Sequence, residues 1–197
     1  MFLEQVTGRW LMEGDLLYGE LVHLTAEEPS VLAEACSRWN KDSEFLRLLD
    51  ANIANQVSAK KITEWIQQDF EKSPEPLYLF GIRTLEGERL IGWMDLEGTL
   101  FPHGEAFVGI GIGEREAWGM GYGTDAMKVI LRYAFQELNL RRVALDTFEY
   151  NPRAIRSYEK AGFSYEGRAR GYLYREGRRW DLVFMGILRE EWLAGSS

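Results

Sequence analysis

The fold of this chain is decided by the stretch Gly109-Ile110-Gly111-Ile112-Gly113-Glu114-Arg115-Glu116-Ala117-Trp118-Gly119-Met120-Gly121-Tyr122-Gly123-Thr124-Asp125-Ala126. It begins as a short apolar run, passes through a loop with glycine at every second position, and then opens a helix. Clustered glycines indicate backbone that turns tightly or approaches another group closely. A loop directly before a helix presents unpaired N–H groups and the positive end of the helix dipole to an anion such as phosphate. The same glycines are also compatible with a tight strand-to-helix turn that binds nothing.

The helix after this loop is predicted from an apolar stripe at three- and four-residue spacing. The stripe consists of Met127, Ile130, Leu131, Ala134, Phe135 and Leu138. Thr124 and Asp125 are interpreted as cap-type side chains that add a negative charge at the helix start. The whole unit of strand, glycine loop and helix is suited to holding a nucleotide phosphate.

Composition narrows the class of protein. The chain has 197 residues and a net charge of −8, which fits a single domain and argues against nucleic acid as a partner. A cationic or amine substrate is compatible with this charge. Cys36 is the only cysteine, so no internal disulfide is expected and a reducing cytoplasm is the expected location. The start of the chain does not resemble a signal peptide, no window reaches the ~18–20 apolar residues of a membrane span, and two histidines with one cysteine do not suit a zinc site.

Working outward along the chain, alternating and helical patterns predict an α+β fold in which antiparallel hairpins flank one strand–helix–strand unit. Strands are expected at 17–24, 77–83, 89–96, 106–112, 142–148, 163–174 and 179–188. Helices are expected at 43–49, at 58–70, after a capping box at 25–28, after the glycine loop, and from Asn151-Pro152 to Gly162. Residues 1–16 are an extension or an added strand, 17–76 form the acceptor-side strand and helices, and 77–192 form the cofactor-binding core.

The segment from Val108 to Trp192 resembles the GCN5-related N-acetyltransferase (GNAT) family, in its branch similar to ribosomal-protein-alanine acetyltransferases. The run 118–123, Trp-Gly-Met-Gly-Tyr-Gly, is similar to the acetyl-coenzyme A pyrophosphate loop. The run 151–163, from Asn151 to Phe163, is similar to the family's second motif. The loop departs from the pattern at Trp118 and Met120, so pyrophosphate would rest on backbone N–H groups and on Arg115 and Arg153. The resemblance implies a mixed, mostly antiparallel sheet that is splayed at the cofactor site and flanked by helices.

The resemblance also implies the chemistry: direct attack of a primary amine on the acetyl thioester of acetyl-CoA. It assigns cofactor binding to Gly111, Ile112, Gly113, Trp118, Gly119, Met120, Gly121, Tyr122, Gly123, Thr124 and Asn151. Tyr158 matches the general acid that protonates the departing thiolate. Asp146 matches the general base, with Asp95, Glu97 and Glu149 as substitutes. In the family the pantetheine arm lies beside the strand at Gly111–Gly113, where a bulge or splay would leave an N–H free for the acetyl oxygen.

Two other functions compete with this one. A coenzyme A-binding sensor or interaction protein would keep the fold and lose the reaction. A Rossmann-type NAD(P) protein would also place glycines before a helix and an acid ~20 residues on, but too little chain follows the loop for a doubly wound sheet. A P-loop is excluded because no Gly-Lys-Ser/Thr follows the glycines. The acceptor, a small-molecule or peptide amine, carries no motif, and a homodimer is common in such folds without any sequence feature that decides it.

Overall fold

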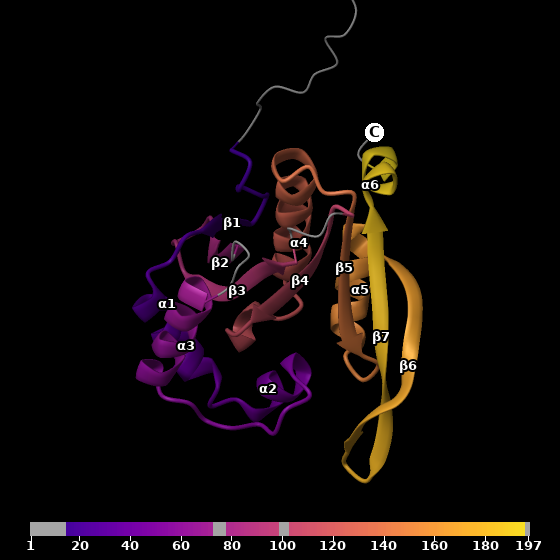
Figure 1. Cartoon of the computed structure of the whole chain (residues 1–197). Coiled ribbons are helices and arrows are strands. Elements are labelled where there is room, and N and C mark those ends of the chain that lie inside the picture. Colours follow the sequence, from indigo (N-terminus) through magenta and orange to yellow (C-terminus); the bar gives the residue numbers. More distant parts are fainter. Residues whose placement is uncertain (1–14, 73–77, 99–102, 196–197) are drawn as a thin grey trace, which may run out of the picture.

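Within the described residues, 15–72, 78–98 and 103–195, this computed structural model contains one seven-stranded sheet in the order β1-β2-β3-β4-β5-β7-β6 (Figure 1). All neighbouring strands are antiparallel except β4 and β5, which are parallel. The strands are β1 (Val22–Thr25), β2 (Tyr78–Thr84), β3 (Leu90–Glu97), β4 (Glu105–Ile112), β5 (Arg142–Phe148), β6 (Ser164–Arg175) and β7 (Arg178–Leu188). The predicted α+β class and mostly antiparallel sheet are confirmed.

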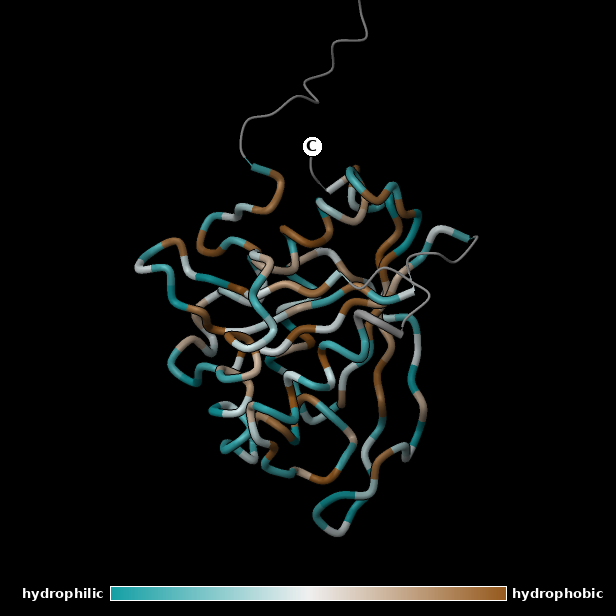
Figure 2. Tube along the Cα trace, turned by 60° about the vertical axis from the view of Figure 1, so that its left-hand side comes forward, coloured by the Kyte–Doolittle hydropathy of each residue, from teal (hydrophilic) through white to brown (hydrophobic). Residues whose placement is uncertain are grey.

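Two apolar clusters join the helices to the sheet. The helical segments are α1 (Pro29–Trp39), α2 (Ser43–Leu49), α3 (Ala59–Lys72), the 3₁₀ turn η1 (Arg115–Ala117), α4 (Tyr122–Arg132), its π-helical continuation η2 (Tyr133–Glu137), α5 (Pro152–Ala161) and α6 (Arg189–Gly195). The larger cluster packs the predicted stripe of α4 and the inner face of α5 against the strands. The smaller cluster joins α1 and α2 to Trp93 and Trp118. Figure 2 shows hydrophobic residues concentrated along the interior strands, and a hydrophilic tip on the β6–β7 hairpin.

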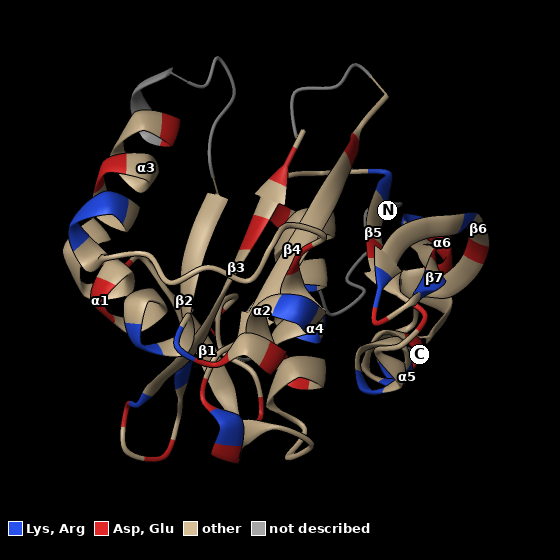
Figure 3. Cartoon of the chain, turned by 90° about the horizontal axis from the view of Figure 1, so that it is seen from below, with Lys and Arg blue, Asp and Glu red and all other residues tan. Residues whose placement is uncertain are grey.

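The parallel pair β4–β5 is very short, and this positions the site. The two strands pair only from Glu105 with Arg142 to Phe107 with Ala144, and then they separate. Helix α4 is the crossover between them, as parallel strands require. Figure 3 shows the resulting gap, with β1–β4 on one side and β5, β7 and β6 on the other. The predicted splay is therefore present at the carboxyl end of β4, where the glycine loop begins.

The N-terminal part of the chain differs from the prediction in two places. The strand predicted at 17–24 is shorter, because residues 16–21 form turns and bends, in which only Tyr18 makes an isolated bridge, to His23 of β1. The capping box at 25–28 is wrong. Helix α1 begins after Glu28, whose side chain makes no capping hydrogen bond, with a proline in its first turn. The Thr25 hydroxyl instead donates to Glu27 Oε1 at 2.7 Å.

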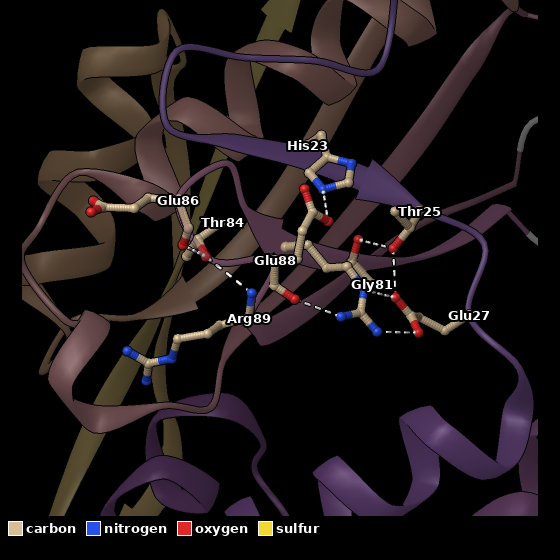
Figure 4. Close-up of polar contacts among 9 residues, drawn as sticks. His23, Thr25, Glu27, Gly81, Thr84, Glu86, Glu88 and Arg89 are labelled. Carbon is tan, nitrogen blue, oxygen red and sulfur yellow. Dashed lines mark hydrogen bonds and ion pairs between the residues drawn. The ribbon is translucent and has the colours of Figure 1, made fainter.

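Ion pairs fix the edge strand β1 to the β2–β3 hairpin (Figure 4). Arg83 on β2 grips the nearly buried Glu27 carboxylate with two nitrogens, at 2.5 and 2.9 Å. These hydrogen bonds lower the pKa of Glu27. The buried His23 ring contacts Glu88 at 2.8 Å, and Tyr18 stacks on its other side. The network lies away from the splay, and we assign it to stabilising an edge strand of only four residues.

Candidate functional site

A cavity of about 710 Å³ opens where β4 and β5 separate. Strands β3, β4 and β5, the glycine loop, the start of α4, one face of α5 and the end of α2 line it. Most of the predicted site residues line this cavity: Gly111, Ile112, Trp118, Gly119, Gly121, Gly123, Thr124, Asp146, Asn151 and Tyr158. Three predicted residues of the same segment, Gly113, Met120 and Tyr122, are not among its lining residues. The structure thus brings both motifs, which lie about 30 residues apart in sequence, to one cavity.

The glycine loop ends in an exposed helix N-terminus at the cavity wall. Gly119 and Gly121 have φ values of 77° and 92°, a left-handed conformation that favours glycine. The first helical hydrogen bond of α4 runs from the Asp125 N–H to the Gly121 carbonyl at 3.0 Å, so the N–H groups of residues 122–124 have no partner within the helix. A methyl group added at Gly123 would come no closer than 3.7 Å to another atom outside its immediate backbone. This combination of unpaired donors and open space suits a phosphate group.

The predicted cap at the start of α4 is wrong, and the residue involved has another role. Gly121 is the N-cap and supplies no side-chain bond. The buried Asp125 carboxylate instead accepts backbone N–H bonds from Glu20, Leu21 and Val22, at 3.1, 2.8 and 3.0 Å. These hydrogen bonds attach the beginning of α4 to the turn that leads into β1. No local sequence pattern predicts this contact, because the partners lie more than 100 residues apart.

Trp118 stands where the loop pattern often has Gln or Arg, and it holds the loop through its indole ring. Its indole N–H donates to the Ile112 carbonyl at 2.6 Å, which closes the loop back on the end of β4. The guanidinium carbons of Arg115 and Arg153 lie 4.7 and 3.9 Å from its ring centre. Arg115 also pairs with Asp42 and Glu44, so the expectation that it would serve the pyrophosphate is not supported. Arg153 lines the cavity, so the expectation that it would serve the pyrophosphate stands.

The glycines of β4 make room for large side chains from neighbouring elements. A methyl group at Gly109, Gly111 or Gly113 would come within 2.4 Å of the Asp95 carboxylate, 3.0 Å of the Trp93 indole or 2.0 Å of the Trp39 ring. The β3–β4 register runs without a shift, so no bulge is present. The Gly113 N–H bonds to the Ile91 carbonyl at 2.9 Å, and alternation then directs the backbone of residues 110 and 112 toward the gap. Ile110, which the sequence analysis did not single out, and Ile112 therefore replace Gly111 and Gly113 as the groups facing the gap.

Helix α5 presents the two residues of the second motif as predicted. The Asn151 side chain accepts from the Ala154 N–H at 3.2 Å, which confirms the N-cap and leaves its amide nitrogen for the cavity. Tyr158 is buried, and its ring packs on Phe163. Among the described residues no hydrogen-bond partner meets the Tyr158 hydroxyl, although it lines the cavity. Burial, and then the Asp146 carboxylate, raise the pKa of Tyr158, so the hydroxyl remains protonated and able to donate.

The four candidate bases lie in different environments. Asp146 on β5 lines the cavity and has no hydrogen-bond or ion-pair partner among the described residues. Partial burial raises its pKa. Asp95 on β3 accepts the Gly109 N–H at 3.0 Å, and burial followed by the Glu97 charge raises its pKa to about 6. Glu97 lines the cavity at the end of β3. Glu149 accepts the Asp181 N–H at 3.0 Å and is not among the lining residues, which removes it as a substitute.

The cavity is lined by charges of both signs. The carboxylates of Asp50 after α2, of Asp95 and Glu97 on β3 and of Asp146 on β5 form what we call its acidic wall, and the cations Arg153, Arg156 and Lys160, all on α5, form its basic wall. The sequence analysis missed Arg156 and Lys160. Their spacing of three and seven residues from Arg153 on a predicted helix was a usable signal, because such positions share one face. The sequence predicts a polar loop near the mouth of the site at 50–56, and Asp50 at its start lines the cavity.

Over residues 15–72, 78–98 and 103–195, no three His, Cys, Asp or Glu side chains are arranged to hold a metal ion. In the same ranges no helix combines the length and the apolar character needed to cross a membrane.

Comparison with known proteins agrees with this geometry. A protein-family model described as an acetyltransferase (GNAT) domain matches residues 20–164. The "Probable N-acetyltransferase YjcK" of Bacillus subtilis (strain 168) is 31% identical over 185 residues, 92% of this chain and 98% of that protein. The "Putative ribosomal N-acetyltransferase YdaF" of the same organism is 33% identical over 138 residues, 70% of this chain and 75% of that protein. A crystal structure of spermidine N-acetyltransferase from Vibrio cholerae with CoA and spermine aligns with a TM-score of 0.76 and 24% identity, covering 87% of this chain and 98% of that one.

Proposed function

Because the chain belongs to the acetyltransferase (GNAT) family and is an acetyl-CoA-dependent N-acetyltransferase, we propose that its acceptor is a primary amine that carries more than one positive charge. The observation that carries this proposal is that four carboxylates line the cavity, whereas its three lining cations all come from the single helix α5. An anionic donor is attracted to the basic wall, and a cationic acceptor is attracted to the acidic wall. Polyamines and basic peptides with a free amino end both fit this description.

On the donor side, we propose that the N–H groups of residues 122–124 hold the pyrophosphate and that Arg153, Arg156 and Lys160 balance further phosphate charge. The Asn151 amide and the backbone of Ile110 and Ile112 would hold the pantetheine arm along β4. The Ile112 carbonyl is already occupied by Trp118, so its N–H and the groups of Ile110 are the ones available. The arm would then fill the place of the missing part of the β4–β5 ladder.

On the acceptor side, we propose that Asp146 receives the proton of the amine and that Tyr158 donates its proton to the sulfur as the thiolate departs. The nitrogen forms the new bond to the acetyl carbon directly. A covalent intermediate on cysteine is disfavoured, because Cys36 does not line the cavity and burial raises its pKa to about 12.

The cytoplasmic location and a homodimer also remain proposals, supported by the single cysteine and by the fold.

A panel of amines tests the acceptor class. Thiol release from acetyl-CoA is measured with spermine, with a lysine-rich peptide bearing a free amino terminus, and with butylamine as the singly charged control. We expect kcat/KM for the multiply charged amines to exceed that for butylamine about tenfold or more, and the advantage to shrink as salt screens the carboxylates. Equal kcat/KM values at low and high salt would argue against the acidic wall as the acceptor site.

Variants of the two aspartates test the base. Asp146→Asn is expected to lower kcat/KM at pH 7 by about 10², and to recover partly near pH 9, where more of the amine has already lost its proton. Asp95→Asn is expected to lower kcat/KM severalfold at pH 7, less than Asp146→Asn, and to lose the rise of the pH profile near 6. In the parent the ionised Asp95 carboxylate attracts the cationic acceptor, so kcat/KM rises severalfold as pH increases through the Asp95 pKa of about 6. If Asp146→Asn matches the parent at every pH, the base is Asp95 or Glu97 instead.

A further inference from the structure

A polar junction joins the end of α2 to the tip of the β6–β7 hairpin. Arg175, at the end of β6, points its guanidinium at the backbone of α2 and of the loop that follows. One nitrogen donates to the Arg47 carbonyl at 2.6 Å and to the Tyr150 hydroxyl oxygen at 2.7 Å. The other donates to the carbonyls of residues 50, 51 and 52, at 3.3, 3.4 and 3.1 Å. One side chain thus binds four carbonyl groups where a helix ends.

Arg175 is reinforced from both sides. The Tyr150 hydroxyl donates to the same Arg47 carbonyl at 2.6 Å. The Arg47 guanidinium forms an ion pair with Glu176 at the hairpin turn. A cation at a helix C-terminus is favourable because it satisfies carbonyl groups that have no partner within the helix and opposes the negative end of the dipole. The junction therefore holds α2 at its C-terminal end, whereas Phe45 in the apolar cluster with Trp39 holds its beginning.

Apolar packing contributes little to this junction. Ile53 in the loop is 91% exposed, and Tyr174 on the hairpin is 65% exposed. A second cavity of about 340 Å³ lies between the loop and the hairpin, lined by Arg47, Arg175 and neighbouring residues. Leu46 and Leu49 pack this end of α2 against the smaller apolar cluster, whereas hydrogen bonds and an ion pair join it to the hairpin. Removing these polar contacts is therefore expected to lower the local stability of the end of α2 and of the loop that follows it.

The held segment is part of the site. Phe45, Leu48, Leu49 and Asp50 line the main cavity on its acidic side. The β6–β7 hairpin extends beyond the rest of the sheet toward the same end of the molecule (Figure 1). We propose that Arg175 is a positioning residue that holds the end of α2 and its loop as the outer wall of the acceptor site. This inference rests on the proposed placing of the acceptor against the carboxylates.

Hydrogen exchange of the full-length protein tests the structural half of the proposal without any acceptor. In Arg175→Gln, the amides at the end of α2, residues 46–50, are expected to exchange about tenfold faster or more, because hydrogen bonds to a charged group are lost. Amides of α4 and α5 are expected to exchange as in the parent. Arg175→Lys, which keeps the charge but not the planar fork, is expected to be intermediate. Arg179→Gln is the matched control, because among the described residues the hydrogen bond and the ring contact of Arg179 lie within its own hairpin.

Kinetics test the functional half. With spermine and the lysine-rich peptide, Arg175→Gln is expected to raise KM for the acceptor about tenfold and to leave KM for acetyl-CoA unchanged. Unchanged exchange in α2 overturns the proposal, and so does faster exchange with a parental acceptor KM. If the parent acetylates neither amine, the acceptor proposal of the previous section fails, whereas the exchange data still decide whether Arg175 holds α2.

Discussion

Tyr158→Phe is expected to lower kcat by roughly 10²–10⁴, the range for a positioned acid, while acetyl-CoA still binds with parental affinity. The substitution keeps the ring that packs on Phe163 and removes only the hydroxyl proton. This hydroxyl is buried without a hydrogen-bond partner among the described residues, so its removal should leave the melting temperature unchanged or slightly higher. The variant is tested by single-turnover rates, by isothermal titration with acetyl-CoA and by thermal melting.

The pH profile adds a second criterion. Burial and the Asp146 charge raise the pKa of Tyr158 above its ordinary value near 10, so no loss of rate below about pH 10 is expected from this group in the parent. Tyr165→Phe, at an exposed ring on β6, serves as the control and should behave as the parent. A Tyr158→Phe enzyme that turns over normally would assign proton delivery to water or another group, and would leave the acetyltransferase activity itself unaffected.

Gly123→Val is expected to weaken acetyl-CoA binding by about 10³, because the branched side chain would occupy the space in front of the N–H groups of residues 122–124. The position suits this test better than Gly121. A side chain at Gly121 would be strained by its φ of 92°, and lost binding could then reflect misfolding. Gly123 has ordinary helical backbone, and an added methyl group meets only Ile112 and Ser157, at 3.7 and 3.8 Å.

Binding is measured by isothermal titration, with thermal melting to show that the variant is folded. A ligand at 100 times its Kd adds about 2.7 kcal/mol of stability, so acetyl-CoA should raise the melting temperature of the parent and not that of Gly123→Val. Gly167→Val on β6, where nothing lies within 4 Å of an added methyl group, controls for the loss of a glycine. Parental affinity in folded Gly123→Val would place the phosphate elsewhere.

The sequence predicted those elements whose signals are local. Alternation located β2 through β7, and the caps at Asn151 and Gly162 bounded α5 correctly. Helix α6 was missed because its seven residues are too few to show a helical period, and its packing depends on the contact of Trp192 with Phe135 of η2, with ring centres 5.5 Å apart. Strand β1 was predicted too long for a related reason. Its start depends on how the preceding turn is held by Asp125, which no local pattern reveals.

The candidate site divides in the same way. The glycine loop, Asn151 and Tyr158 belong to contiguous motifs, so their positions in the cavity followed from the sequence. The pKa of Asp95 depends on Gly109 across a strand pair, and the contacts of Arg175 with residues 47–52 span more than 120 residues. The pKa differences among the carboxylates are set by burial, which is a property of the folded chain. The family resemblance therefore put Asp146 first among four possible bases, but the sequence could not predict the environment of any of them.

The glycines Gly109 and Gly111 of β4, and Gly113 directly after it, also have a consequence for evolution. Each glycine lies against a larger side chain: Gly109 against Asp95, Gly111 against Trp93, and Gly113 against Trp39. A methyl group at Gly109 or Gly113 would overlap its partner, so an ancestor could replace that glycine only after, or together with, a smaller side chain on β3 or α1. In relatives that diverge at the acceptor wall, we expect compensatory substitutions at these paired positions rather than independent drift.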